Sequence, residues 1–182
     1  MENYKDFKKK CSEEISNQGN DKQQKVLSEE WFKVANSHNY SYHFEALGRP
    51  IIQYPQDIVC VQELIYECKP DLIIETGIAH GGSIINSAAM LVLLDVIDGK
   101  DPRASNRKVV GIDVDIRQHN KEALDKHPLN FKYELIEGSS IDNKVIEKVK
   151  THAEQYNKIM VMLDSMHTET VSYTHLTLPT KA

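Results

Sequence analysis

The sequence predicts an α/β fold in which about four parallel strands form a Rossmann-like sheet with helices on both faces. Short apolar runs alternate along the chain with longer helical segments, as in parallel strands joined by right-handed crossovers. The predicted strands are residues 72–75, 109–115, 131–138 and 158–164. Polar residues follow each run directly, so we expect the four strand ends to converge on one crevice, where open parallel sheets bind ligands.

The segment ahead of this sheet is polar and has a helical composition as far as Ser37. Ser28 is the expected N-cap of its most structured part. Residues 37–56 then predict a loop that is rich in Tyr and His and punctuated by Gly and Pro. Such a loop either lines a substrate pocket or is a surface loop anchored by its aromatic side chains.

The helices between the strands are predicted from their apolar periodicity and their ends. They are residues 57–68, 84–97, 117–128 and 140–156. Residues 84–97 are apolar nearly all round, which predicts a buried helix. Ser140 or Asp142 is expected to cap the last of these helices.

The composition disfavours several classes of function. A formal net charge of -5 and a pI near 5.9 argue against nucleic-acid binding, which needs a clustered basic surface. The most apolar stretch, residues 84–97, is too short to span a bilayer, and the N-terminus has no signal-peptide core, so a cytoplasmic setting is expected. Cys60 and Cys68 lie in an apolar helix and are expected to be buried, and the absence of a CxxC motif disfavours zinc and redox sites.

The first strand is followed by the glycine-bearing turn E-T-G-I-A-H-G-G-S. Gly77 and Gly82 fit the first and third glycines of the dinucleotide pattern G-x-G-x-x-G, but Ala79 holds the middle position, where glycine allows close approach to a pyrophosphate. The turn therefore suits a nucleoside ligand without phosphates, although a turn that only lets strand and helix pack is the plain alternative. Glu75, at the strand end, would either hold an amine or fix the loop through backbone N–H groups.

Acidic and hydroxyl residues follow the next two strands. Asp113 is placed to accept the hydroxyls of a ribose, and Asp115 is a less suitable partner because it lies past the strand end. Ser139 and Ser140 are placed to reach the edge of an adenine. Helix capping is the alternative role for each pair.

Asp164 comes directly after an apolar run that we expect to be a central strand, so its carboxylate should be buried, and buried carboxylates are paired or bind metal. It would ligate a hard divalent cation together with further oxygen ligands. His167 is a candidate base, although a structural histidine is the favoured interpretation. His167 and Glu169 also imitate half of an iron site, but no second histidine can be named for it.

Several segments together resemble the family named for cephalosporin hydroxylase and rhamnosyl O-methyltransferase, from about Trp31 to His167. The matching segments are LGRPIIQYPQDIVCVQELIYECKPDLIIETGIAHGGS, VVGIDVDIRQHNK, HPL, LIEGSSID and MVMLDSMHT. The resemblance implies a class I S-adenosylmethionine-dependent methyltransferase sheet with a Mg2+ site near the methyl donor. It also implies methyl transfer to a hydroxyl of a sugar, other glycan or small natural product, with the cation lowering the pKa of the acceptor.

The same resemblance assigns roles by position. The cofactor loop would be formed by Glu75, Gly77, Ala79, Gly81, Gly82 and Ser83. Asp113 would hold the ribose and Ser139 and Ser140 would lie near the adenine. Asp164 would be the first metal ligand and, with His167, a catalytic residue. In the family an acidic pair after the next strand completes the metal site, and this sequence has no such pair.

Three alternatives to this function remain at the level of the sequence. An NAD-linked oxidoreductase or epimerase would use a similar sheet, and a non-catalytic nucleoside-binding protein would need no metal ligands. A true hydroxylase would require iron and an oxidant. Small-molecule or glycan acceptors are the expected partners, and nothing in the sequence excludes a homo-oligomer.

The resemblance divides the chain into three parts. Residues 1–55 form a helical and loop extension, residues 56–169 a partial cofactor-binding domain, and residues 170–182 a tail that looks like a translated sequencing-library adapter. We therefore expect an incomplete sheet that lacks its C-terminal strands and leaves the fourth strand as an unprotected edge. We expect this fragment to be inactive as a methyltransferase.

Overall fold

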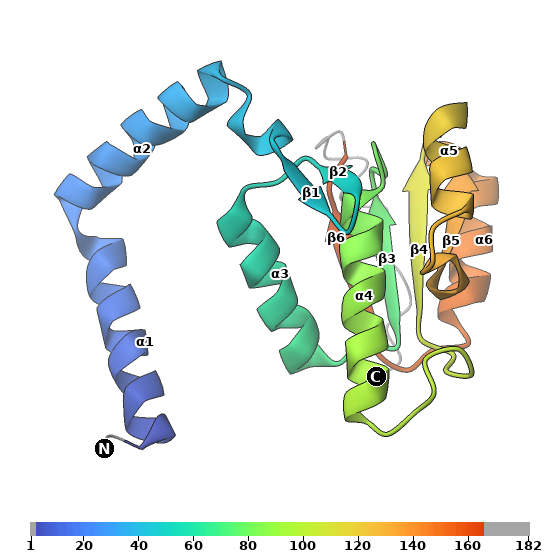
Figure 1. Ribbon diagram of the computed structural model, residues 1–182, viewed down its shortest axis with the longest axis horizontal. Coiled ribbons are helices and arrows are strands. Elements are labelled where there is room, and N and C mark those ends of the chain that lie inside the picture. The colour runs from blue at the N-terminus through green and yellow to red at the C-terminus, as the bar shows by residue number, and fades with distance from the viewer. Residues whose placement is uncertain (1–2, 166–182) are drawn as a thin grey trace. The chain divides into compact units, whose positions relative to one another are not determined.

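The computed structural model of the chain describes residues 3–165 (Figure 1). The chain divides into two compact units, residues 1–41 and residues 42–182. This division falls ahead of the boundary after residue 55 that the sequence predicts. Within the described residues no helix is both long and apolar enough to cross a membrane.

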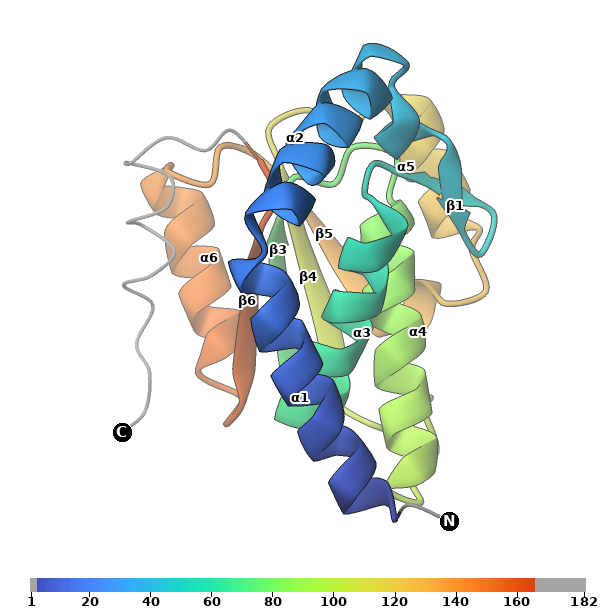
Figure 2. The same ribbon diagram turned by 90° about the vertical axis from the view of Figure 1, so that its left-hand side faces the viewer.

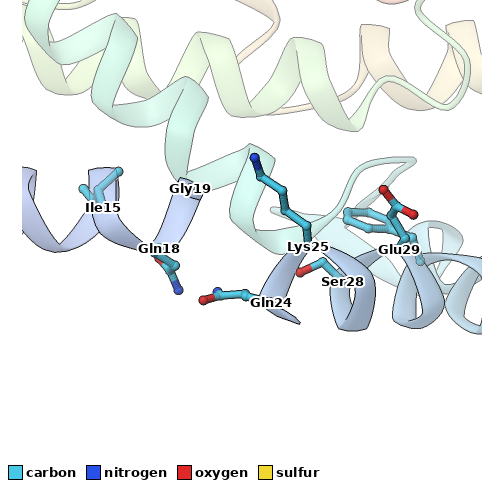
Figure 3. A pocket seen from close by; sticks show the side chains of 8 residues that line it. Ile15, Gln18, Gly19, Gln24, Lys25, Ser28 and Glu29 are labelled. Carbon is cyan, nitrogen blue, oxygen red and sulfur yellow. The ribbon is translucent and has the colours of Figure 1, made fainter. Parts of the chain in front are cut away.

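The first unit consists of two helices, α1 (Tyr4–Asn20) and α2 (Lys22–Ser37). The carboxylate of Asp21 caps α2 by accepting hydrogen bonds from the backbone N–H groups of Gln23 (2.8 Å) and Gln24 (3.1 Å). Ser28 lies inside α2, so its prediction as the N-cap is wrong, because the helix begins further upstream. Side chains of both helices line an open hollow of about 470 Å³ (Figure 3).

A short 3-10 helix, η1 (Tyr40–Tyr42), lies at the boundary of the two units, and the second unit continues with a hairpin of β1 (Phe44–Ala46) and β2 (Arg49–Ile51). The sequence predicts a loop over residues 37–56, and this prediction is wrong for the residues that form the hairpin. Leu47 and Gly48 form its two-residue turn with φ of 48° and 85°. Positive φ at both positions is the geometry that matches the twist of two antiparallel strands. Figure 1 shows the hairpin lying beside the N-terminal end of α4 (Gly82–Ile97).

The sheet has four parallel strands in the order β5-β4-β3-β6, which confirms the predicted fold class (Figures 1 and 2). The strands are β3 (Leu72–Thr76), β4 (Lys108–Asp113), β5 (Tyr133–Glu137) and β6 (Ile159–Leu163). Among the described residues β6 pairs only with β3, so it is an edge strand there. This agrees with the predicted edge position of the fourth strand, whereas the expectation of a central strand ahead of Asp164 is not met within the described residues.

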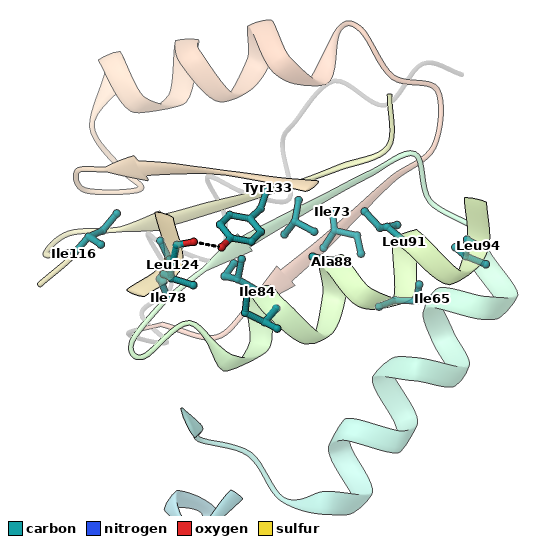
Figure 4. Close-up of a cluster of buried hydrophobic side chains, with 12 residues drawn as sticks. Ile65, Ile73, Ile78, Ile84, Ala88, Leu91, Leu94, Ile116, Leu124 and Tyr133 are labelled. Atoms are coloured by element: carbon teal, nitrogen blue, oxygen red, sulfur yellow. Dashed lines mark hydrogen bonds between the residues drawn. The ribbon is translucent and has the colours of Figure 1, made fainter. Parts of the chain in front are cut away.

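Helices cover both faces of this sheet (Figure 2). One face carries α3 (Pro55–Cys68), α4 and α5 (Gln118–Asp125), and the other carries α6 (Asn143–Ala153). The central strand β3 serves both faces by alternation, because Ile73 packs toward α4 while Leu72 and Ile74 pack toward α6. Figure 4 shows the α4-side core, in which the Tyr133 hydroxyl donates a hydrogen bond to the Leu124 carbonyl oxygen (2.6 Å). A short 3-10 helix, η2 (Asn130–Lys132), leads into β5.

Two expectations about helices need correction. Cys60 and Cys68 are exposed, because α3 buries Ile65 against the core and turns these positions outward. Asp142, not Ser140, caps α6, since its carboxylate accepts a hydrogen bond from the backbone N–H of Lys144 (2.7 Å).

A buried ionic cluster ties the second half of α4 to the loop before β4. Asp95 pairs with Arg107 (3.0 Å) and with Lys132 (2.5 Å), and all three side chains are 5% exposed or less. Arg107 also pairs with the more exposed Asp98 (2.6 Å). Each buried charge has a partner of opposite sign, which offsets much of the desolvation that burial costs.

Candidate functional site

The four strands reach the carboxyl edge of the sheet in register. Thr76 at the end of β3 is paired with Ile112 in β4 and with Leu163 in β6, and Asp113 is paired with Glu137 in β5. The segments that follow the strands therefore leave the sheet side by side, as the sequence predicts. This edge brings the turn after β3 next to Asp113 and the start of the segment after β6.

The turn after β3 needs glycine at Gly77. Its φ is 93°, and its backbone N–H donates to the Ile112 carbonyl oxygen (2.8 Å). A β-carbon at this position would overlap the backbone carbonyl oxygen of Asp164. The close passage of the chain after β6 and the positive φ both exclude a side chain here.

Ala79, at the middle position of the dinucleotide pattern, has a φ of 46°. Glycine would adopt this left-handed conformation without strain, so alanine at this position must be held in it by other contacts.

The two glycines that open α4 pack against protein. A β-carbon on Gly81 would lie 2.6 Å from the Leu124 side chain, and one on Gly82 would overlap the Pro50 carbonyl oxygen in β2. Close approach of α5 and of the hairpin therefore explains both glycines. Their contact with a ligand remains a prediction.

Asp113 braces the glycine turn. One carboxylate oxygen, Oδ2, accepts hydrogen bonds from the backbone N–H groups of Ile78 (2.7 Å) and Ala79 (3.1 Å). The other, Oδ1, accepts from the N–H of Asp115 at 3.2 Å. The sequence offered Glu75 as the residue that fixes this loop through backbone N–H groups, but Asp113 makes these contacts.

Two residues that the sequence analysis did not single out hold the carbonyl side of the same turn. Asn120 in α5 donates from Nδ2 to the Ala79 carbonyl oxygen (2.9 Å), and Arg49 in β2 donates from Nε to that of His80 (2.9 Å). Arg49 Nη2 also donates to Asn120 Oδ1 at 2.7 Å. No local pattern marks these residues, because they lie far from the turn in the sequence and meet it only in the folded chain.

Glu75 is the buried carboxylate of the site. Its side chain is fully buried, and neither carboxylate oxygen makes a well-formed hydrogen bond within the described residues. Burial raises the pKa of Glu75 to about 8; the nearby Ser83 side chain opposes this shift and the charge of Asp164 adds to it. Glu75 is therefore largely protonated at neutral pH in the unliganded chain.

Asp164 is exposed, which corrects the expectation of a buried carboxylate at this position. Its backbone N–H donates to the Thr76 carbonyl oxygen (3.0 Å), and Gln53 Nε2 lies 3.4 Å from its Oδ2. Within residues 3–165 no group of three His, Cys, Asp or Glu side chains is arranged to hold a metal ion. His167, the other predicted catalytic residue, lies outside the described residues.

Two cavities lie at this edge of the sheet. The larger, of about 290 Å³, is lined by Thr76, Gly77, Ile112, Asp113, Val114, Gly138, Ser139, Ser140, Ile141 and Ser165. The smaller, of about 140 Å³, is lined by residues 50–53, 77–80, Gly82, Ser83 and Asp164. The predicted ribose and adenine residues thus share the larger cavity, and most of the predicted cofactor loop lines the smaller one. Neither Ser139 nor Ser140 caps α6, so capping does not explain them.

Residues 38–179 match the family model described as Rhamnosyl O-methyltransferase/CmcI. The chain belongs to this family. The match includes the glycine turn, both cavities and part of the segment that the sequence analysis assigned to an adapter-like tail. The family predicted from the sequence is thereby confirmed. No curated protein sequence is detectably similar to the chain.

Several solved structures are similar to the chain at low sequence identity, and the apo CmcI structure shares its fold. An apo structure of CmcI is 19% identical, with a TM-score of 0.50 over 74% of this chain and 50% of that one. A CmcI structure described as Mg-SAM is 19% identical, with a TM-score of 0.46 over 74% and 51%. A putative caffeoyl-CoA O-methyltransferase from Staphylococcus aureus is also 19% identical, with a TM-score of 0.49 over 96% and 68%. The chain spans about half the length of the CmcI structures it matches.

Proposed function

We propose that the chain binds S-adenosylmethionine across the carboxyl edge of its sheet and provides the cofactor-binding part of an O-methyltransferase. Membership of the family supports this activity. The observation that carries the proposal is the pair of hydrogen bonds from the Ile78 and Ala79 N–H groups to Asp113. In a dinucleotide site the glycine turn approaches the pyrophosphate. Here a carboxylate occupies two donors of the turn, which favours a nucleoside ligand without phosphates over NAD.

The charges at this edge also favour a cationic ligand. The carboxylates of Asp113 and Asp164 lie around the turn, and the nearby cation Arg49 already donates to a carbonyl oxygen and to Asn120. S-adenosylmethionine carries a sulfonium and an ammonium group, whereas the pyrophosphate of NAD carries two negative charges. The carboxylates would attract the cationic groups of S-adenosylmethionine and repel the pyrophosphate of NAD, so both effects favour S-adenosylmethionine.

The nucleoside fits the larger cavity. Asp113 lines it, and a carboxylate has about four acceptor positions, so it can accept a ribose hydroxyl while it holds the turn. Val114 and Ile141 line the same cavity with exposed apolar side chains, which suit the faces of an adenine. Ser139 and Ser140 supply hydroxyl groups for its polar edge.

The methionine end of the ligand would lie toward the smaller cavity. Glu75 is fully buried close to the Ser83 side chain, and a ligand ammonium placed near it would favour its charged form. The Ser83 side chain lines this cavity and also interacts with Glu75, so it connects the cavity to the buried carboxyl group. Glu75, Gly77, Ala79, Gly82 and Ser83 would then act together as the sequence predicts.

We propose that the methyl group passes to a hydroxyl of a sugar or small natural product. S-adenosylmethionine supplies an electrophilic methyl group when it is bound, so the protein contributes mainly alignment of the acceptor. Asp164 would be one ligand of a Mg2+ ion, but residues 3–165 offer no complete ligand set, and we assign no step to the metal. His167 stays a proposed catalytic residue.

Hydrogen exchange with and without S-adenosylhomocysteine tests where the ligand lies. We expect the ligand to slow exchange in residues 76–79 and 138–141, because residues 76–77 and 138–141 line the larger cavity and residues 77–79 line the smaller one. The loop 98–106, at the opposite end of β4, serves as the internal control. Protection of the control loop alone, or of no segment, would contradict the proposal.

A further inference from the structure

Four backbone groups of the glycine turn are held by side chains from other elements, beside the backbone hydrogen bond from Gly77 to Ile112. Within the turn, the N–H of Gly81 donates to the Ile78 carbonyl oxygen at 2.7 Å. Asp113 accepts the two N–H groups of Ile78 and Ala79, and Asn120 and Arg49 donate to the next two carbonyl oxygens. The shape of the turn therefore depends on residues that lie outside it.

Ala79 shows why such support is needed. A non-glycine residue with a φ of 46° is strained relative to its ordinary conformations. Asn120 holds the Ala79 carbonyl oxygen from a side chain that is only 2% exposed. Because the amide is buried, its hydrogen bond has little competition from water and fixes the orientation of the Ala79–His80 peptide.

Arg49 links this contact to the hairpin. Its guanidinium group donates to Asn120 Oδ1 and to the His80 carbonyl oxygen, so one side chain fixes both the amide and the next peptide group. The hairpin itself is seated on α4, since the Pro50 carbonyl oxygen lies against Gly82. A continuous chain of contacts thus runs from β2 through the turn to α5.

We propose that Arg49 and Asn120 are positioning residues that set the conformation of the glycine turn for ligand binding. The inference rests on the proposed function, because the turn is the part of the site around which S-adenosylmethionine would bind. Neither residue lines the larger cavity. They hold the backbone carbonyl groups of residues 79 and 80. The conformation of the glycine turn then sets the position of the groups that would face the ligand.

A measurement without ligand tests the structural half of this proposal. In Arg49→Met and Asn120→Ala we expect the Ile78 and Ala79 amides to exchange about tenfold faster, because loss of one charge-assisted or buried hydrogen bond is worth about 1.4 kcal/mol. Arg103→Met is the matched control, since Arg103 stacks on Phe131 (4.4 Å) and makes no contact with the turn. Unchanged exchange of both amides in both variants would overturn the proposal.

Calorimetric titration with S-adenosylhomocysteine tests the functional half. We expect Kd to rise about tenfold in Arg49→Met and less in Arg49→Lys, which keeps the charge and one donor. Arg103→Met should bind as the wild type does. A wild-type Kd in Arg49→Met and Asn120→Ala would overturn the positioning role. If the wild-type chain itself binds no S-adenosylhomocysteine, the proposed function fails, and the exchange rates alone decide the role of these residues.

A rescue experiment separates positioning from general stability. Glycine adopts a φ of 46° without strain, so adding Ala79→Gly to Asn120→Ala should recover part of the lost affinity. Thermal unfolding of each variant shows whether it is folded at the titration temperature. Equal affinities for Asn120→Ala with and without Ala79→Gly would show that Asn120 does not act through the conformation of residue 79.

Discussion

The carboxylate of Asp113, at the end of β4, accepts a 2.7 Å hydrogen bond from the backbone N–H of Ile78 in the turn after β3. The same oxygen accepts from Ala79 at 3.1 Å. This relationship joins two adjacent strand ends and at the same time occupies two N–H groups that would otherwise face a phosphate. This contact holds the turn, and it supports the proposal of a ligand without phosphates.

Asp113→Asn should weaken S-adenosylhomocysteine binding by about tenfold or more. The amide keeps one acceptor oxygen but loses the charge that strengthens its hydrogen bonds to the turn and to a ribose. Calorimetric titration measures the change. Asp115→Asn is the matched control, because Asp115 is exposed and contacts Asp113 only through its backbone N–H. Equal losses of S-adenosylhomocysteine affinity in the two variants would contradict a specific role of Asp113.

Glu75→Gln should change how stability depends on pH. The pKa of Glu75 is raised from 4.5 to about 8 by burial, so the folded chain binds one more proton than the unfolded chain between these values. The stability of the wild type relative to Glu75→Gln should therefore fall as pH rises from about 4.5 to about 8, by roughly 5 kcal/mol. Denaturant unfolding across this range measures it, and a pH-independent difference would contradict the buried, unpaired state of Glu75.

Gly77→Ala should destabilise the chain far more than Gly99→Ala. Both glycines have positive φ, of 93° and 69°, so both variants lose about 1 kcal/mol of conformational free energy. Only Gly77 lies against backbone, that of Asp164, while nothing surrounds a β-carbon at Gly99. We expect an additional loss of about 2 kcal/mol or more at Gly77, measured by denaturant unfolding. Similar losses would show that the segment after β6 does not pass so close to the turn.

Asp95→Ala should lower the free energy of unfolding by about 3–5 kcal/mol, because it leaves Arg107 and Lys132 buried without their shared anion. Glu63→Ala, which removes an exposed carboxylate from α3, should change stability by about 0.5 kcal/mol or less. Variants that fold should bind S-adenosylhomocysteine normally, since the ionic cluster does not line either cavity. A small loss of unfolding free energy in Asp95→Ala would mean that water reaches the ionic cluster.

The strands and most helices were predictable because each carries its own periodic pattern. The apolar run 72–75 and the acid at Asp113 are local features, and the alternation of elements fixes a parallel sheet. The hairpin at Arg49 was missed, since its two strands have only three residues each and its turn uses Leu47 where glycine or asparagine is usual.

The site was predictable only in part, for the same reason. Asp113 and the glycines stand at strand ends, where the pattern marks them. Which carboxylate is buried depends on neighbours from distant elements, so Glu75 is buried and Asp164, which was expected to be buried, is exposed. Asn120 lies on a polar helix, and it contacts the turn only because α5 packs beside the turn in the folded chain.

Parallel calorimetric titrations of the 182-residue chain with S-adenosylhomocysteine and with NAD bear most directly on the ligand assigned to this site. We expect one S-adenosylhomocysteine to bind per chain and NAD to produce no binding heat, because Asp113 already occupies N–H groups of the turn. Binding of NAD without binding of S-adenosylhomocysteine would contradict the account.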